Sequence, residues 1–281
     1  MRERLLKGAR RAVWSIAALC LLAGGLMVAA HAFNAEKRTT ISPSRRIEAF
    51  QPGESLTYNV SWSKAVKAGT AVLEVKGERF PDGREVLRFI VTSRTVGIMG
   101  RFYPLGDTVQ SVFDPKTMQS LSYSLQARHG KRTRRRELVF DHVNRTVVSR
   151  LNDDPPKTLA IPDQVQDALS ALYYLRTRND FAVDKPIIIE VFDGGTSRSI
   201  EVLTLGREKI KTPAGEFNTI KIKASEGIFM GEGELDLWLT DDSRKVPALI
   251  KTRIAIGSIV FTLKDLKSGQ LATGAGGQLQ H

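Results

Sequence analysis

The sequence contains a single cysteine, Cys20, among its 281 residues. This cysteine lies in the first apolar stretch, so a mature chain that begins beyond it has no thiol. The scarcity excludes a disulfide scaffold, a cysteine nucleophile and a thiolate metal site together. The four histidines form no i, i+4 pair and no HExxH pattern, so we expect no bound metal and no cofactor.

Catalytic and phosphate-binding patterns are scarce as well. Asp241-Asp242, after Trp238, could be paired carboxylates for acid–base chemistry or calcium. Adjacent residues at a β-turn point to different sides and no partner base is suitably spaced, so a self-capped aspartate turn is the simpler interpretation. The glycine-bearing turns at 212–216 and 231–233 lack the strand–loop–helix context of a phosphate loop. We therefore expect no enzyme, and an envelope hydrolase stays the second alternative.

Acidic residues are the minority, with 30 against 42 basic residues and a formal charge of +12. Residues 1–32 carry five basic residues and one acidic residue, so their removal leaves +8. Such a charge favours anionic partners, for example phospholipid headgroups, lipopolysaccharide or acidic polymers. An exported protein rarely meets nucleic acid, so we expect no nucleic-acid partner.

The longest apolar run lies close to the N-terminus. Residues 1–11 are positively charged, residues 12–30 are apolar apart from Ser15, and Ala30-His31-Ala32 is an A-x-A cleavage pattern. These features predict a signal peptide, residues 1–32, and a mature chain in the periplasm of a bacterium with two membranes. The alternative is an inner-membrane anchor formed by residues 12–30, because about 19 apolar residues can just span a bilayer. Residues 33–49 then form a polar linker.

From residue 50 onward, apolar and polar residues alternate. Alternation is typical of half-buried strands, and residues 54–64 show it clearly. Turn residues, among them those at 67–69 and 80–83, connect consecutive strands and predict an antiparallel meander. Residues 50–266 form a single domain without internal repeats, and the glycine-rich residues 267–281 predict a disordered tail. Further strands are expected near 70–79, 86–95, 107–113, 119–128, 134–143, 145–151, 187–193, 198–205, 216–223, 233–240, 248–256 and 258–266.

One stretch, residues 162–178, has helical periodicity instead. Asp163 is placed to cap its first turn, and Gln166 completes a capping box. Its apolar residues are spaced i, i+3, i+4 and i+7: Val165, Ala168, Leu169 and Leu172. About a dozen strands approach the limit of an open sheet, which should therefore coil. We predict a mainly β fold, a large curved antiparallel meander or half-open β-barrel, with this amphipathic helix packed on the concave face.

Four motifs stand in order along the strand-rich region. They are GESLTYNVSW at 53–62, DALSALYYLR at 167–176, KTPAGEF at 211–217, and WLTDD at 238–242 with Pro247 after it. Together they resemble the bacterial domain-of-unknown-function 3108 family over roughly residues 50–266. The resemblance implies a fold similar to the half-barrels of the Lol lipoprotein carriers, whose concave faces hold acyl chains. The chain lacks the lipobox of the lipoprotein members of that group.

Residues expected on the inner face form the first candidate site. An acyl-chain pocket in a barrel is apolar with few polar anchors. The alternative is that the helix plugs the half-barrel and the same residues are ordinary core. The candidates are Tyr58, Trp62, Leu169, Leu172 and Tyr173.

A basic run at 128–136 forms the second candidate site. At a hairpin tip it could dock on an anionic membrane surface or a glycolipid headgroup. The alternative is a charged hairpin that protects the sheet edge from pairing. Its six basic residues are Arg128, Lys131, Arg132, Arg134, Arg135 and Arg136.

The sequence as a whole predicts an exported cell-envelope protein that binds or shuttles an amphipathic ligand, either a lipid or a lipid-linked glycan. The first alternative is a structural or assembly factor that binds an envelope protein or a polysaccharide. Carrier and assembly factor differ in whether the purified protein carries lipid.

The export signal can be tested directly. Residues 1–40 fused to a reporter that is active only outside the cytoplasm should give an active reporter, because the charged start, the apolar run and the A-x-A pattern form a complete signal. An inactive reporter would contradict export. N-terminal sequencing of the mature protein separates the two versions: a start at Phe33 indicates cleavage, and an intact residue 1–32 segment on membrane-bound protein indicates the anchor.

Overall fold

The computed structural model describes residues 47–62, 66–95, 105–129, 132–224, 234–254 and 257–269. The expected signal peptide, most of the expected linker and most of the expected tail lie outside these residues. Within them, no helix is both long enough and apolar enough to cross a membrane.

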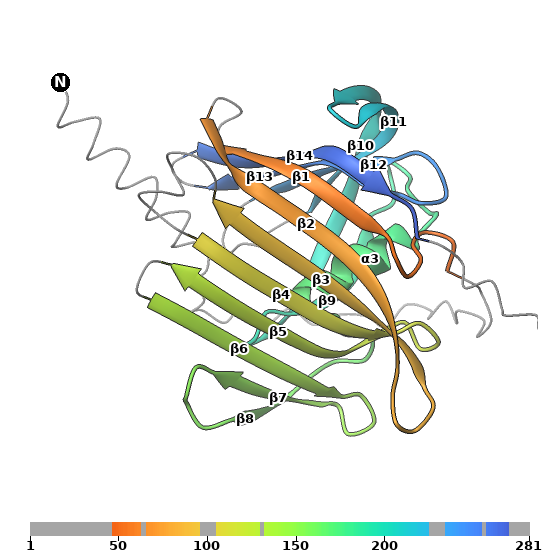
Figure 1. The fold of residues 1–281 in the computed structure, drawn as a ribbon. Coiled ribbons are helices and arrows are strands. Elements are labelled where there is room, and N and C mark those ends of the chain that lie inside the picture. The colour runs from red at the N-terminus through yellow and green to blue at the C-terminus, as the bar shows by residue number, and fades with distance from the viewer. Residues whose placement is uncertain are drawn as a thin grey trace, which may run out of the picture.

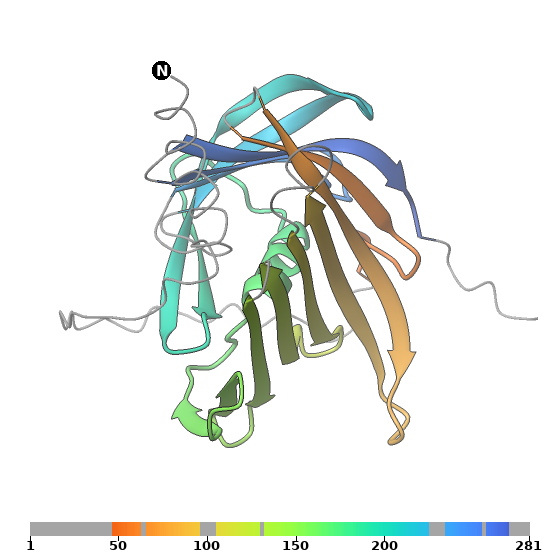
Figure 2. The ribbon, with the colours of Figure 1, turned by 60° about the vertical axis from the view of Figure 1, so that its left-hand side comes forward.

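The described strands form one antiparallel sheet of 14 strands, which curves around a helix (Figures 1 and 2). The spatial order is β8-β7-β6-β5-β4-β3-β2-β1-β14-β13-β12-β11-β10-β9, so β8 and β9 are the two edges. This confirms the predicted curved meander, and the described residues contain one helix, which lies inside it. The strands are β1 Ser55–Trp62, β2 Val66–Arg79, β3 Glu85–Thr95, β4 Leu105–Asp114, β5 Gln119–His129, β6 Arg132–Asp141, β7 Thr146–Leu151, β8 Lys157–Ala160, β9 Ile187–Phe192, β10 Ser197–Thr212, β11 Gly215–Ala224, β12 Leu235–Thr240, β13 Pro247–Ile254 and β14 Gly257–Lys267.

Two expected boundaries were wrong for identifiable reasons. The expected turn at 67–69 lies inside β2, where Gly69 pairs with Thr95. A Cβ at Gly69 would lie 2.4 Å from the Arg94 carbonyl oxygen, so this glycine permits close strand approach and does not mark a turn. Strand β10 continues past residue 205 to Thr212, through a bulge at Gly206 whose φ is 144°. The short edge strand β8 was not expected.

The helix α3, Ala168–Arg176, begins later than predicted. Its N-cap is Asp167, not Asp163, and Ser170 completes the capping box instead of Gln166. The preceding segment is extended, because the Gln166 N–H donates to Glu190 O and its carbonyl accepts from the Phe192 N–H of β9. This parallel bridge covers part of the β9 edge, so a long-range strand contact overrides the local helical pattern.

The helix fills one end of the half-barrel. It contacts β4 and β9, and Figure 1 shows it behind β1–β4, toward the right-hand ends of these strands. Leu172 packs in a cluster with β1, β2 and β9–β14, and Leu169 and Tyr173 pack in a second cluster with Phe89 and Phe113. A third cluster, which includes Val165 and Phe192, packs where the two edges of the sheet approach each other.

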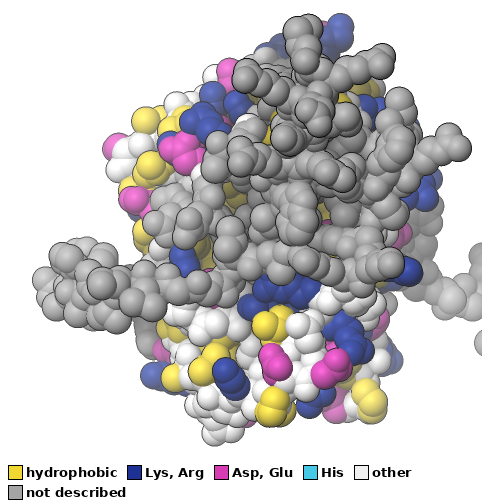
Figure 3. All heavy atoms as spheres, turned by 90° about the vertical axis from the view of Figure 1, so that its left-hand side faces the viewer, with side chains coloured by type: hydrophobic (Ala, Val, Ile, Leu, Met, Phe, Trp, Pro, Cys, Tyr) yellow, Lys and Arg dark blue, Asp and Glu magenta, His cyan; other side chains and the backbone are white. Residues whose placement is uncertain are grey.

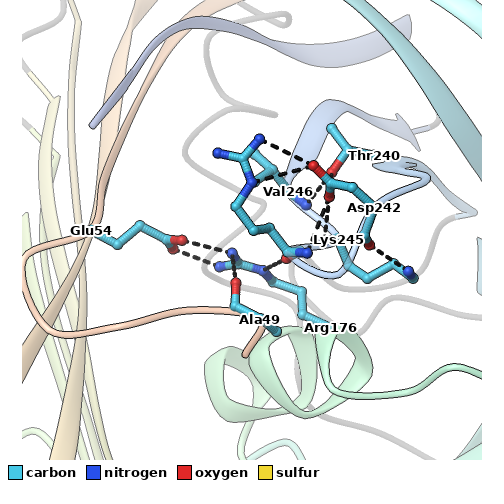
Figure 4. A network of polar contacts seen from close by, with 8 residues as sticks. Ala49, Glu54, Arg176, Thr240, Asp242, Lys245 and Val246 are labelled. Atoms are coloured by element: carbon cyan, nitrogen blue, oxygen red, sulfur yellow. Dashed lines mark hydrogen bonds and ion pairs between the residues drawn. The ribbon is translucent and has the colours of Figure 1, made fainter. Parts of the chain in front are cut away.

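A buried ion pair anchors the C-terminal end of α3 (Figure 4). The Arg176 guanidinium donates to both carboxylate oxygens of Glu54, at 2.7 and 2.8 Å, and to the carbonyls of Ala49 and Arg244. Burial alone would lower the pKa of Arg176, but the pKa is raised, chiefly by the Glu54 carboxylate and further by the Tyr173 and Tyr58 hydroxyls. Ala49, expected at the end of the linker, is therefore part of the core.

This ion pair should respond asymmetrically to mutation. Glu54→Gln should lower the free energy of unfolding by about 3–5 kcal/mol, because it leaves the guanidinium buried without its counter-charge. The double variant Glu54→Leu/Arg176→Met should recover much of that loss. The matched control is Glu85→Gln, whose ion pair with Arg79 is about 70% exposed, and which should leave the free energy of unfolding nearly unchanged. Chemical denaturation measures all three, and equal costs for Glu54→Gln and Glu85→Gln would contradict this role.

Candidate functional site

The registers of the ladders place the inner-face residues in rows across the sheet. The row beside α3 runs through Phe89, Ser111, Tyr123 and Leu138. Tyr123 is half-buried, and the other three residues are at most 2% exposed. Each step of two residues back along β4, from Ser111 to Val109 and then Asp107, leads away from the helix. Burial can therefore be followed row by row from the helix-filled end toward the other end.

The next row is apolar and less buried. It runs from Leu73 through Val91, Val109 and Leu125 to Arg136 on successive strands. Val91 and Val109 are half-buried, whereas Phe89 and Ser111, two residues along the same strands toward the helix, are fully buried. Leu125 on β5 is half-buried, as is Tyr123 beside the helix. We call Val91, Val109, Leu125, Arg134 and Arg136 the open-end site.

One further step from the helix, three of the four residues in the row are polar, and the fourth, Ala127, is buried. Ser93, Asp107, Ala127 and Arg134 lie opposite one another on β3 to β6. Arg134 is half-buried and shares a face of β6 with Arg136, because alternate residues of a strand point to the same side. An apolar surface thus borders two guanidinium groups on the concave side. Figure 3 faces the end at which β5 ends and β6 begins, and lysine and arginine side chains gather near the middle of that view.

Arg136 joins the two edges of the open sheet. Its side chain, 7% exposed, donates from Nη1 to the Asp193 carbonyl in the β9–β10 turn at 2.6 Å. The neighbouring Ser149 hydroxyl donates to Gly194 O at 3.0 Å. A Cβ at Gly194 would lie 1.6 Å from Nη1, so glycine is needed for this approach. Burial and the nearby charge of Arg134 lower the pKa of the Arg136 guanidinium.

The predicted acyl-pocket residues divide between the two ends. Tyr58, Leu169, Leu172 and Tyr173 are at most 3% exposed and pack around the helix, as the plug alternative requires. The Tyr58 hydroxyl donates to Pro247 O, and the Tyr173 ring stacks on Phe89 at 3.7 Å. Trp62 differs because it is half-buried and lies at the end of β1 away from the helix. The candidate ligand surface is therefore not the helix-filled end but the other end of the half-barrel, the open end.

The six basic residues do not share one face. Arg128 and Arg135 are exposed, and Arg135 pairs with Asp153 at 2.7 Å on the outer face. Arg134 and Arg136 point inward, so alternation along β6 separates them from the outer basic residues. Arg132 lies in β6, but its side chain and the whole of Lys131 fall outside the described residues. The inward position of Arg136 corrects the prediction that all six belong to an exposed hairpin tip.

A cluster of serine and aspartate side chains bears on the envelope-hydrolase alternative. The hydroxyls of Ser111 and Ser120 donate to Asp167 Oδ2 at 2.6 and 2.5 Å, and Oδ1 accepts the N–H groups of Leu169 and Ser170. Burial raises the pKa of the Asp167 carboxyl, and these hydrogen bonds oppose that rise. All three side chains are 0% exposed, so the cluster caps a helix and offers no access to a substrate.

The aspartates at 241–242 form a turn, as interpreted from the sequence. Asp242 accepts from the Thr240 hydroxyl and the Arg244 N–H, whereas Asp241 faces Arg207. Trp238 lies on the outer face, where Lys221 Nζ covers its ring at 5.0 Å and Glu208 accepts from its indole N–H. Among the described residues, histidine, cysteine and carboxylate side chains form no group of three that could hold a metal ion.

The family model "Protein of unknown function (DUF3108)" matches residues 57–264. The chain belongs to the DUF3108 family. No curated protein matches it.

Solved structures similar to this DUF3108 protein show the fold alone. The β-barrel-like DUF1849 protein from Brucella abortus is 11% identical, with a TM-score of 0.54, over 79% of this chain and 100% of that chain. A candidate exported protein with YmcC-like fold from Bacteroides fragilis is 15% identical, with a TM-score of 0.31, over 78% and 97%. A candidate lipoprotein from Parabacteroides distasonis is 11% identical, with a TM-score of 0.30, over 77% and 96%.

The motifs that carried the resemblance to DUF3108 meet at the helix-filled end. The first supplies Glu54 and Tyr58, the second supplies Arg176, and the last supplies the turn at 240–242 and Pro247. The Ala214 N–H of the third motif donates to Leu263 O in β14. These motifs therefore hold the helix and the sheet together. The open-end site lies outside them, and sequence reasoning missed its apolar residues because only strand registers show which of them share a row.

Proposed function

We propose that this DUF3108 protein is an exported cell-envelope protein that binds an amphipathic ligand, a lipid or a lipid-linked glycan, on its concave face and without catalysis. The observation that carries the proposal is the loss of burial along β3 and β4, from the buried Phe89 and Ser111 to the half-buried Val91 and Val109. The half-buried Leu125 extends this apolar surface onto β5. Small-molecule sites are usually apolar, with a few polar groups that anchor the ligand. The mouth of a β-barrel is one of the places where they occur.

Export is supported by the charged start, the apolar run at 12–30 and the pattern Ala30-His31-Ala32. In that compartment acyl chains come from the membranes, and the net charge of +8 beyond residue 32 favours anionic lipids over neutral ones. A shuttle would take up its ligand at one membrane and release it at another, whereas a binder would hold it. Both use the same concave surface.

Filling the open end should remove the ligand. Leu125→Trp adds bulk to the half-buried apolar row, so we expect most of the lipid that co-purifies with the wild type, seen by native mass spectrometry, to be lost. Val139→Trp is the matched control: it lies on β6, 57% exposed on the convex face, and should keep the lipid. Thermal melting confirms that both variants are folded. The proposal would be contradicted if the wild-type protein carries no lipid, or if only the Val139→Trp variant loses its lipid.

A role as an assembly factor is the second candidate, because the convex face offers a surface to another protein. Val139 and Val148 lie opposite each other on β6 and β7 and are 57% and 40% exposed. Val139 also lines a shallow hollow of about 210 Å³, whose lining includes Arg88, Gln110 and Glu137. In this case Val139→Trp should disrupt a complex with an envelope protein, and Leu125→Trp should leave that complex intact.

A further inference from the structure

The fold contains two buried arginines with opposite electrostatic surroundings. Arg176 is 1% exposed and has a bidentate carboxylate partner, Glu54. Arg136 is 7% exposed, yet within the described part of the chain it forms no ion pair. Its Nη1 has the Asp193 carbonyl, and its Nε is buried without a hydrogen-bond partner. Burying a cation without a counter-charge costs free energy. An anion bound next to Arg136 would reduce this cost.

The charge of the nearby Asp193 carboxylate favours the Arg136 cation, but in the described part of the chain no carboxylate forms an ion pair with Arg136. The Asp193 carboxylate accepts the N–H groups of Gly195 and Thr196 within its own turn, and its other oxygen lies 3.4 Å from Arg198 Nε. Asp107 lies two strands from Arg134 in the same row, and it accepts the Arg128 N–H at 3.3 Å. Arg134 adds a second positive charge beside Arg136 on the same face of β6. The local charge is therefore positive.

The apolar row ends directly at these arginines. Leu125 on β5 and Arg136 on β6 are ladder partners, and Ala127 and Arg134 are partners in the next row. An acyl chain lying on Val91, Val109 and Leu125 would thus bring its head to the two guanidinium groups. Guanidinium has planar geometry that matches the oxygens of phosphate and carboxylate, and its hydrogen bonds to such anions are charge-assisted.

We propose that Arg134 and Arg136 bind the anionic head group, a phosphate or a carboxylate, of an amphiphile whose apolar part lies on Val91, Val109 and Leu125. This assignment rests on the proposed function and adds the charge class of its ligand. A neutral or cationic head would leave Arg136 without a counter-charge, so the site discriminates by head group.

Matched amphiphiles with a common dodecyl chain test the assignment. Dodecyl phosphate, dodecanoate, dodecanol and dodecyltrimethylammonium are titrated below their micelle concentrations into residues 33–281 purified from the periplasm, with calorimetry as the readout. The two anions should bind about 10- to 100-fold more tightly than dodecanol, the range expected for hydrogen bonds to a charged group. The ratio between the phosphate and the carboxylate identifies which head group the site prefers.

Three variants locate the effect. Arg134→Gln, at a half-buried side chain, should lower the affinity for the anions about ten-fold or more and leave dodecanol binding unchanged. Arg150→Gln removes one exposed charge from the outer face of β7 and should change neither. Arg136→Lys keeps the charge but loses the planar geometry, and it should also weaken anion binding. Circular dichroism establishes that each variant is folded.

The outcomes separate this assignment from the function on which it rests. Equal binding of anionic and neutral amphiphiles would overturn the head-group assignment and leave the apolar site standing. If Arg134→Gln and Arg150→Gln lower the affinity for the anions equally, the net charge of the protein acts at long range. That result would also overturn the head-group assignment. Binding of no dodecyl compound would overturn both proposals.

Discussion

The buried ion pair between Arg176 and Glu54 determines which end of the half-barrel is filled. It joins the last turn of α3 to the start of β1, and the carbonyls of Ala49 and Arg244 bind the same guanidinium. Asp167 fixes the other end of the helix to Ser111 and Ser120 on β4 and β5. With both ends held, the nine-residue helix packs against β4 and β9. The inner face is less buried from the middle of the strands onward. Val91 and Val109 lie at this boundary, where they still pack against the cluster of Leu169 and Tyr173, and Leu125 follows beside Arg136.

The DUF3108 motifs indicate a fold more clearly than an activity because they lie mostly at the helix-filled end, where their residues hold the helix and the sheet together. Their polar residues, such as Glu54, Arg176 and Asp242, are occupied by one another or by the backbone. A group engaged in this way cannot also contact a ligand without breaking the contacts that place the helix. The residues available for recognition are those that the packing leaves incompletely paired, and Arg136 is one of them.

Local patterns predicted the strands well, because alternation of apolar and polar residues is recorded in the sequence itself. They failed where a distant contact decides the outcome. Gln166 is extended because β9 pairs with it, and Gly69 serves a close approach to β3, which no local pattern shows. The basic run looked like one patch because sequence distance ignores the two faces of β6. Once the register is known, Arg134 and Arg136 fall on the concave face and Arg135 on the other.

Quenching of tryptophan fluorescence by brominated acyl chains tests most directly whether the ligand lies on the concave face at the open end. Beyond residue 32 the chain has two tryptophans, Trp62 at the open end of β1 and Trp238 on the outer face. Bromine quenches only indoles in near contact. We predict that a brominated fatty acid quenches the Trp238→Phe variant, in which Trp62 remains, and leaves the Trp62→Phe variant unchanged. Equal quenching of the two variants, or quenching through Trp238 alone, would contradict a ligand on the concave face.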